Sequence, residues 1–386
     1  MTQSQQTAER RFFAVDFRGV QPASRERTAL SVVGDAGLEI IAGLPAALPV
    51  PAEVEAGGRV TLGLGGEAAR AAFAYAALGG LVRLFAAVGE DAAGEVVLRW
   101  LAARGAGTEG VRRGGRTPIS VLVWTAGCQP LAIQDAEAVP GAAIDAGALS
   151  FGVRGPRSAA SGQESGPWGV GDDVRGRTSD WGTSGASGPE RRSQGEAPAA
   201  PLAARGGTLL LAGYPYARGL RGEGAVQLLR AARAQGLRAV VSLAPVALGG
   251  LGPPLAPADL EGMLPHVDLI CGGGPELRRA TRRADAYDAA RALIGGGARA
   301  VLAKRGPEGA SVFRPGPAAL EREDTSTPAA VSGLPAADPL RRAAAFGAVY
   351  DAAYLLGVAL NDGSPARFAA AAAARAAASD QGVLGI

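Results

Sequence analysis

The chain has 386 residues, 47% of them hydrophobic, so it can form one large domain or two small ones around a sizeable core. Its 39 basic and 36 acidic residues leave a formal net charge of only +3, which does not indicate binding to nucleic acid or to a membrane surface. One histidine and two cysteines are too few ligands for a Cys/His zinc cluster, so we predict no metal site of that kind.

The N-terminal segment MTQSQQTAERRFFAVDFRG is polar and lacks the apolar stretch of a secretion signal. No run of about 18 apolar residues is free of charge, since the longest candidate, 343–360, contains Asp351. Without a secretion signal, Cys128 and Cys271 are expected to be free thiols. We therefore expect a cytoplasmic protein without a transmembrane helix.

The first part of the chain alternates strand and helix patterns after a flexible polar tail, residues 1–28. The strands are expected at 29–33, 82–88, 117–124 and 130–135, the last two as a hairpin. Residues 63–79 are expected to form a glycine turn and then an Ala-rich helix, and a second helix should follow Asp91 and extend to about 103.

Residues 152–206 have a different composition. They are rich in Gly, Ser, Pro and Arg and almost free of aliphatic residues, so they cannot bury enough apolar surface to offset the entropy of ordering. We predict a disordered low-complexity insertion within the domain. It holds Trp168 and Trp181, which leaves open a role in binding a partner.

Regular patterns resume at Thr208. Strands are expected at 208–211, 239–242, 269–271 and 300–303, and helices at 222–235, 276–281, 286–294, 341–360 and 365–379. Strands that alternate with helices indicate a parallel sheet covered on both faces.

Four segments, in this order, resemble the ribokinase/PfkB family of sugar and nucleoside kinases. They are the strand and glycine Val32-Val33-Gly34, the pair Gly65-Gly66, the stretch VGEDAAG at 88–94 and the segment VLAKRGPEGA at 301–310. The resemblance extends over residues 29–382 apart from the insertion.

The resemblance implies an α/β, ribokinase-like three-layer fold. A central, mostly parallel sheet would carry helices on both faces, and a small β lid from about 44–62 and 117–136 would cover the substrate. It further implies a sugar or nucleoside as ligand, ATP and Mg²⁺ if the chain is active, and a homodimer formed through the lid.

In this family a GAGD motif supplies the aspartate that acts as general base, and its backbone N–H groups bind the transferring phosphate. One register places the motif at residues 335–338, with Asp338 as the base and Ala336 and Ala337 in the anion hole. The other register places it at residues 341–344. It fits the flanking sequence with fewer gaps and puts Ala344 at the base position.

Asp338 also has a structural interpretation, because Asp followed by Pro339 is a common start of a helix. We favour the second register, and the first stays open.

The other site residues implied by the resemblance fall into two groups. Substrate would be held by Glu39, Gly65, Gly66 and Arg70, and the nucleotide by Lys304, Gly306 and Glu276. Arg70 replaces the family's asparagine, and an equally good reading makes it a solvated helix residue. Glu276 keeps the acid of an NxxE motif that has lost its asparagine, and it can equally be an acid in the first turn of a helix.

Three hypotheses for function follow. The first is a catalytically impaired carbohydrate kinase homologue that acts by binding a sugar, nucleoside or nucleotide. The second is an active ATP-dependent kinase with Asp338 as base. The third and weakest is an interaction protein that uses the 152–206 insertion.

Overall fold

The computed structural model describes residues 29–44, 59–125, 131–134, 207–215, 220–244, 255–326, 345–359 and 364–378. The predicted tail at 1–28 and the predicted insertion at 152–206 lie outside these ranges, and both stay predictions.

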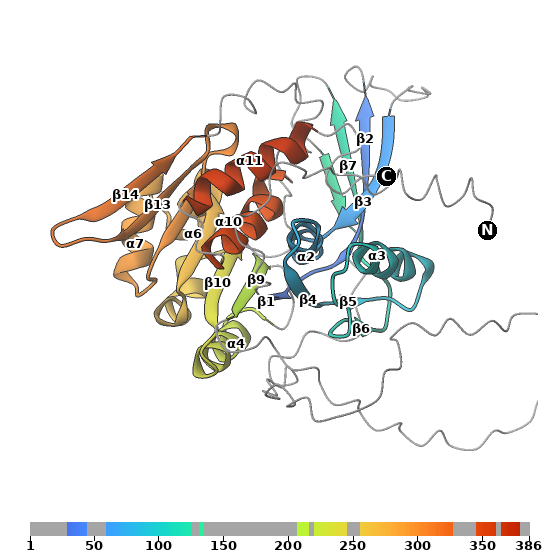
Figure 1. Cartoon of the computed structure of the whole chain (residues 1–386), viewed down its shortest axis with the longest axis horizontal. Helices are drawn as coiled ribbons and strands as arrows, with labels where there is room; N and C mark the ends of the chain where they lie inside the picture. The colour runs from blue at the N-terminus through green and yellow to red at the C-terminus, as the bar shows by residue number, and fades with distance from the viewer. Residues whose placement is uncertain are drawn as a thin grey trace, which may run out of the picture.

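An eight-stranded sheet forms the centre of the molecule, with the strand order β14-β13-β12-β11-β10-β9-β1-β4 (Figure 1). The pairs from β4 to β12 are parallel, and β13 and β14 continue the sheet as an antiparallel hairpin. The strands are β1 (Ala29–Val33), β4 (Leu81–Phe85), β9 (Thr208–Tyr214), β10 (Arg238–Leu243), β11 (Leu269–Gly273), β12 (Val301–Lys304), β13 (Ala310–Pro315) and β14 (Leu320–Thr325).

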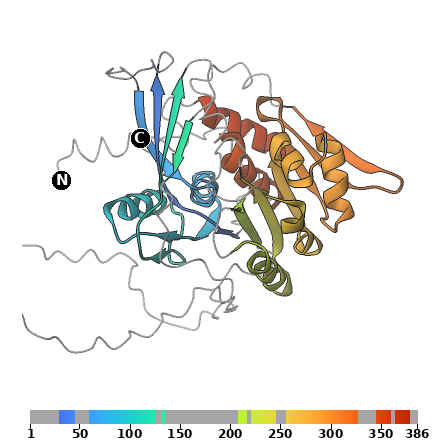
Figure 2. The same ribbon diagram turned by 180° about the vertical axis from the view of Figure 1, so that it is seen from behind.

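Two layers of helices cover this sheet because successive residues of its buried strands point to opposite faces. On β9, Leu210 and Ala212 belong to one core, whereas Leu209 and Leu211 belong to the other. The first core holds α2 (Glu67–Ala77), α3 (Ala92–Ala103), α10 (Tyr350–Ala359) and α11 (Pro365–Ala378). The second holds α4 (Glu223–Ala234), α5 (Pro257–Glu261), α6 (Gly274–Thr281) and α7 (Ala286–Gly295), which face the viewer in Figure 2.

Short elements complete the list. They are the paired strands β5 (Ala87–Val88) and β6 (Arg112–Arg113), the 3₁₀ turns η3 (Leu264–His266) and η4 (Gly306–Glu308), and the π-helical turn η5 (Ala345–Val349). No helix within the described ranges is long and apolar enough to cross a membrane.

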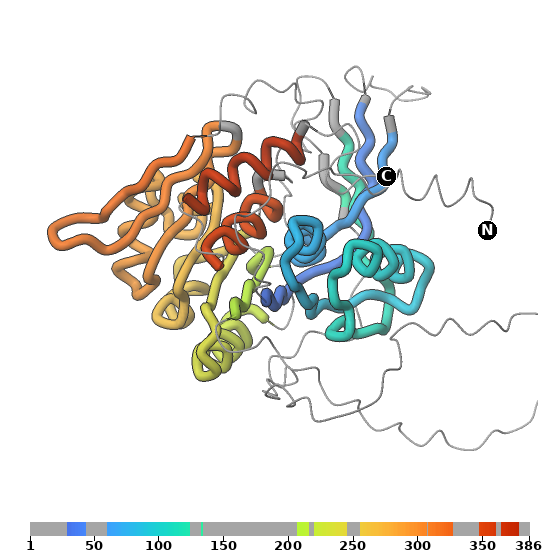
Figure 3. Tube along the Cα trace, viewed as in Figure 1, coloured from blue at the N-terminus to red at the C-terminus, as the bar shows by residue number. Residues whose placement is uncertain are grey.

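A separate four-stranded sheet, in the order β3-β2-β7-β8, rises beside the central sheet (Figures 1 and 3). Its strands are β2 (Gly37–Leu44), β3 (Arg59–Gly65), β7 (Ile119–Thr125) and β8 (Leu131–Gln134). The strands at 37–44 and 59–65 begin earlier and end later than the predicted lid segment 44–62. Glu39 lies opposite Ser120 on one face of this sheet, and Ile40 lies opposite Val121 on the other.

The VGEDAAG stretch fixes β7 to α3. The Asp91 carboxylate caps α3 by accepting the Gly94 N–H at 2.8 Å, and it also accepts the Thr117 N–H at 2.8 Å and the Thr117 hydroxyl at 2.6 Å. The Thr117 hydroxyl oxygen in turn accepts the Gly89 N–H at 2.9 Å. A Cβ at Gly89 would collide with the Thr117 backbone, and one at Gly94 with the Gly89 carbonyl. The motif is therefore a structural clasp at the base of the smaller sheet.

Most predicted elements are confirmed within one to three residues, among them β1, α3, α4 and α7. The β13–β14 hairpin was not predicted, because Pro315 and Pro317 argue against a strand and the outer strand LEREDT has no apolar alternation. The predicted strand 82–88 is divided into β4 and β5, and the predicted helix at 341–360 is described from residue 345, where it begins as the π-helical η5.

Candidate functional site

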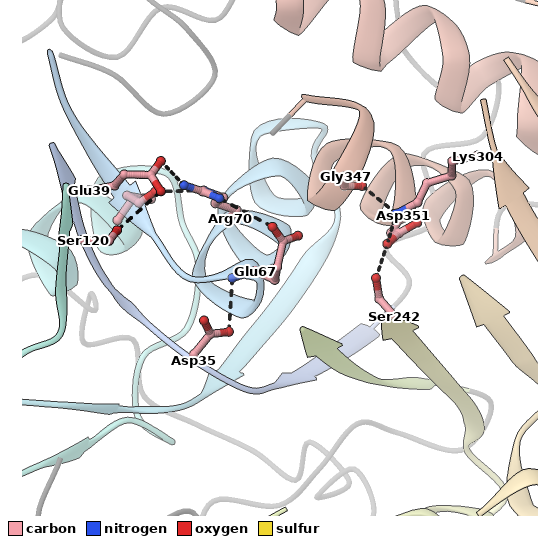
Figure 4. A network of polar contacts seen from close by, with 10 residues as sticks. Asp35, Glu39, Glu67, Arg70, Ser120, Ser242, Lys304, Gly347 and Asp351 are labelled. Carbon is pink, nitrogen blue, oxygen red and sulfur yellow. Dashed lines mark hydrogen bonds and ion pairs between the residues drawn. The ribbon is translucent and has the colours of Figure 1, made fainter. Parts of the chain in front are cut away.

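The site lies where the chain reverses its direction of travel across the sheet. From β1 the chain reaches β4 on one side and later returns to β9 on the other. Ligands of open α/β sheets bind outside the carboxyl ends of the strands at such a switch point. Polar and charged side chains gather at this edge of the sheet in two clusters (Figure 4).

Arg70, on α2, is the centre of the first cluster. Its guanidinium donates to the Leu64 carbonyl at 3.0 Å, forms a close ion pair with Glu39 and lies 3.5 Å from the Glu67 carboxylate. The residue is only 3% exposed, so the interpretation as a solvated helix residue is wrong. Its role in holding a ligand stays a prediction.

Glu39 comes from β2 of the smaller sheet, and its other oxygen accepts a long hydrogen bond of 3.5 Å from the Ser120 hydroxyl on β7. The Glu39–Arg70 pair thus joins the smaller sheet to α2. Because a carboxylate and a guanidinium are both removed from water here, each depends on the other for its solvation.

Asp35, in the turn after β1, caps α2 from a distant part of the chain. Its carboxylate accepts the Glu67 backbone N–H at 3.2 Å, at the positive end of the helix. Burial raises the pKa of Asp35, although the N–H groups of α2 and the charge of Arg70 oppose this.

The predicted pair Gly65-Gly66 allows this approach. Gly66 has a φ of +87°, and a Cβ there would lie 2.5 Å from the Asp35 carbonyl oxygen. A Cβ at Gly65 would lie 2.9 Å from Leu38. The pair is needed for close backbone packing, whether or not it also faces a ligand.

Glu67, the first residue of α2, has its carboxylate between the two clusters (Figure 4). Burial raises its pKa to about 7, although the charges of Arg70 and Lys304 oppose this. A Cβ on Gly347 of η5 would lie 3.5 Å from the Glu67 Oε2 atom, so the carboxylate faces the start of the last core helices.

The second cluster is built around Lys304, at the end of β12. Its ammonium donates to Asp351 Oδ2 at 2.9 Å and lies 3.5 Å from the Gly347 carbonyl. The Ser242 hydroxyl, from β10, donates to the same Asp351 oxygen at 2.5 Å. Although burial lowers it, the Asp351 carboxylate holds the pKa of Lys304 above its usual value.

Cys271 points to the same face of the sheet, from β11. It is a buried free thiol, and burial together with the Asp351 charge raises its pKa well above the usual value. Such a thiol is inert at neutral pH.

Gly306, predicted to contact the nucleotide, has a φ of +60°, and a Cβ there would meet nothing within 4 Å. Glu276 lies in the first turn of α6, with its carboxylate over Gly273. Lys304 is paired with Asp351, so a phosphate would have to compete for it.

The assignment of Gly306 and Lys304 to a nucleotide stays a prediction; ATP, if bound, would supply the transferable phosphoryl group. Within the described ranges no three His, Cys, Asp or Glu side chains form a group that could hold a metal. Magnesium is commonly bound by one or two carboxylates plus substrate phosphates. Glu276 is the described acid that the resemblance assigns to this task.

The structure does not test the predicted base and anion hole. Asp338, Ala336, Ala337 and Ala344 lie outside the described residues. The residues that the sequence analysis did not single out for the site are Asp35, Glu67, Ser120 and Ser242. Asp351, which the sequence analysis noted only as a charge within 343–360, belongs to the second cluster.

Comparison with known proteins agrees with this architecture. Residues 28–130 match the model of the pfkB family of carbohydrate kinases. No curated protein sequence matches the chain.

Solved structures share the fold at low sequence identity. Ribokinase of Arabidopsis thaliana, complexed with ribose and ATP, has a TM-score of 0.61 and 19% identity, with 93% of this chain and 95% of that chain covered. Adenosine kinase of Sinorhizobium meliloti has a TM-score of 0.60 and 15% identity, with coverages of 93% and 96%. Ribokinase of Cryptococcus neoformans, in complex with ADP, has a TM-score of 0.59 and 16% identity, with the same coverages of 93% and 96%.

The fold is thus that of the ribokinase-like proteins. Within this fold, residues 28–130 are similar to the pfkB family of carbohydrate kinases.

Proposed function

We propose that the chain binds a sugar, a nucleoside or a nucleotide at the carboxyl ends of β1 and β9, and that phosphoryl transfer is impaired. The observation that carries this proposal is the state of its two buried cations. Arg70 is neutralised by Glu39, and Lys304 by Asp351, so neither charge is free for a phosphate.

The energy of these pairs is large on the scale of catalysis. Breaking a buried ion pair costs about 3–5 kcal/mol, and about 1.4 kcal/mol is a factor of ten in rate. A transition state that must draw Lys304 away from Asp351 therefore loses about two to four powers of ten in rate. Binding through hydroxyl and ring contacts does not carry this cost.

The test is a panel of sugars and nucleosides, each titrated calorimetrically and each offered with ATP and Mg²⁺ in a coupled assay for ADP. The proposal predicts saturable binding of at least one ligand with turnover far below that of an Arabidopsis ribokinase control. Turnover comparable to the control would overturn the impairment, and absence of binding would overturn the binding role.

An active kinase that uses Asp338 is the alternative function. The similarity of the fold to ribokinases complexed with ATP or ADP supports it. Under this alternative, Asp338→Asn abolishes turnover. A third candidate, an interaction protein, is tested by deletion of residues 152–206, which should abolish capture of a partner without a change in thermal stability.

We also propose that a second copy of the chain covers the outer face of the smaller sheet. The described side chains of that face are apolar, and on its outer strands Val60 is 70% exposed and Ile133 is 53% exposed. Analytical ultracentrifugation should show a dimer for the wild type and a monomer for the double variant Val60→Asp/Ile133→Asp. A monomeric wild type would contradict this assembly.

A further inference from the structure

The Glu67 carboxylate occupies the middle of the site. It faces Arg70 on one side and Gly347 of η5 on the other, and the charges of Lys304 and Asp351 both act on its pKa (Figure 4). It belongs to neither of the two close ion pairs, Glu39–Arg70 and Asp351–Lys304.

Three other described carboxylates of the two clusters have closer contacts than Glu67. Glu39 forms a close ion pair with Arg70, and Asp351 accepts hydrogen bonds from the Lys304 ammonium and the Ser242 hydroxyl. Asp35 caps α2. Glu67 has only the 3.5 Å contact with Arg70 among the contacts of the described residues, which is too long for a strong hydrogen bond. Among these four carboxylates, Glu67 is thus the one whose contacts within the described residues are all 3.5 Å or longer, while Asp351 has one oxygen, Oδ1, without a hydrogen-bond partner.

The residue that the Glu67 carboxylate faces is close in sequence to the predicted base position. Gly347, which the Glu67 carboxylate faces, is three residues after Ala344, the residue that the favoured register places at the base position. The Glu67 carboxylate therefore approaches a backbone position that follows, by three residues in the sequence, the residue where that register lacks an acid.

We propose that Glu67 is the general base for the slow phosphoryl transfer that remains in this chain. The inference rests on the proposed binding function, because it needs a hydroxyl ligand at the switch point beside α2.

The step balances with ATP as co-substrate. The ligand hydroxyl gives its proton to the Glu67 carboxylate as its oxygen forms a bond to the γ-phosphorus. The bond between that phosphorus and the oxygen bridging to the β-phosphate breaks, and ADP leaves. The protonated Glu67 then returns its proton to solvent.

The charges around Glu67 suit this task. Arg70 and Lys304 favour its ionised form, whereas burial, Asp35 and Asp351 favour its neutral form, and the pKa is held at about 7. A base is most effective when its pKa is near the working pH. A free glutamate, with an ordinary pKa near 4.5, would be ionised but weakly basic.

The experiment follows transfer of the γ-phosphate of ATP to D-ribose, D-fructose and adenosine over long incubations, with wild type, Glu67→Gln and Glu67→Asp. We expect Glu67→Gln to lower the transfer rate about 10²–10⁴-fold, the usual contribution of a general base, with ligand affinity changed by no more than a few-fold. Glu67→Asp should recover part of the rate and move the acid limb of the pH profile.

Glu223→Gln is the matched control. Glu223 is also the first residue of a helix that follows a glycine, but it is exposed and lies on α4, in the opposite layer. This variant should transfer phosphate at the wild-type rate.

Two outcomes would overturn the proposal. One is unchanged transfer in Glu67→Gln, above all if Asp338→Asn abolishes it. The other is binding of an acceptor by a wild type that transfers nothing to any of the three, which leaves the proposed binding function intact. If the wild type bound none of the acceptors, the proposed binding function itself would fail, and with it the basis of this inference.

Discussion

Glu39 on β2 and Arg70 on α2 form a buried ion pair, although 31 residues separate them in the sequence. The pair joins the smaller sheet to the helix that begins at the switch point. Both charged groups are buried, so each one stabilises the other in place of water.

Removal of one partner should therefore be strongly destabilising. We expect Glu39→Gln to lower the free energy of unfolding by about 3–5 kcal/mol, because Arg70 is left as a buried charge without its carboxylate. Urea denaturation followed by circular dichroism measures this.

The apolar double variant Glu39→Leu/Arg70→Met serves as its control and should be much closer to the wild type, since it buries no unpaired charge. Equal destabilisation of the single and double variants would contradict the assignment of the cost to an unpaired charge.

Thr117→Val should loosen the clasp between β7 and α3. Valine keeps the shape of threonine but loses the hydroxyl that donates to Asp91 and accepts from the Gly89 N–H. Leaving these buried groups unpaired costs about 1–3 kcal/mol. Thermal unfolding should show the loss, and faster amide exchange should be confined to residues near 87–95 and 112–125. A uniform increase in exchange over the chain would argue against a local clasp.

Gly66→Ala tests the glycine at the start of α2. A side chain there is strained at a φ of +87° and would press against the Asp35 carbonyl at 2.5 Å. We expect a loss of stability of about 1–3 kcal/mol. Gly79→Ala has a similar φ of +90° but open space around its Cβ, so it separates strain from collision. If both variants lost the same stability, the collision with Asp35 would be excluded as a cause.

The titration of Glu67 predicts how stability depends on pH. Its folded pKa of about 7 is above the ordinary 4.5, so between these values the folded state binds more protons than the unfolded state. Stability from this group is then present below pH 4.5 and is lost as the pH rises through 7. The loss is on the order of 3 kcal/mol.

Chemical denaturation from pH 5 to pH 8 should show this decline in the wild type and a smaller one in Glu67→Gln. The raised pKa of Asp35 acts in the same direction and should remain in the variant. An identical slope in both proteins would contradict the assignment to Glu67.

Local patterns explain why much of the fold could be predicted. The apolar run before Gly34 and the strand-to-helix alternation after Thr208 specify parallel strands and covering helices without any knowledge of contacts. The β13–β14 hairpin escaped because its outer strand is charged and solvent-facing, and its prolines lie at the ends of strands where no ladder hydrogen bond is required.

The site was predicted less completely because its contacts join distant segments. Arg70 and Lys304 stood out by residue type and motif, but their partners depend on strand register and on the packing of α10 over the sheet. Ser242 and Glu67 carried a weaker signal: each is a polar residue next to a run of apolar or small residues, at a strand end or a helix start. Such residues are worth examining in any predicted parallel sheet.

The most direct test of the central claim, that the carboxyl ends of β1 and β9 bind the ligand, is hydrogen–deuterium exchange with and without a ligand found by calorimetry. We predict slower amide exchange in residues 34–40 and 65–71 when the ligand is bound, with little change in β13 and β14. Protection elsewhere, with these two segments unchanged, would contradict the account.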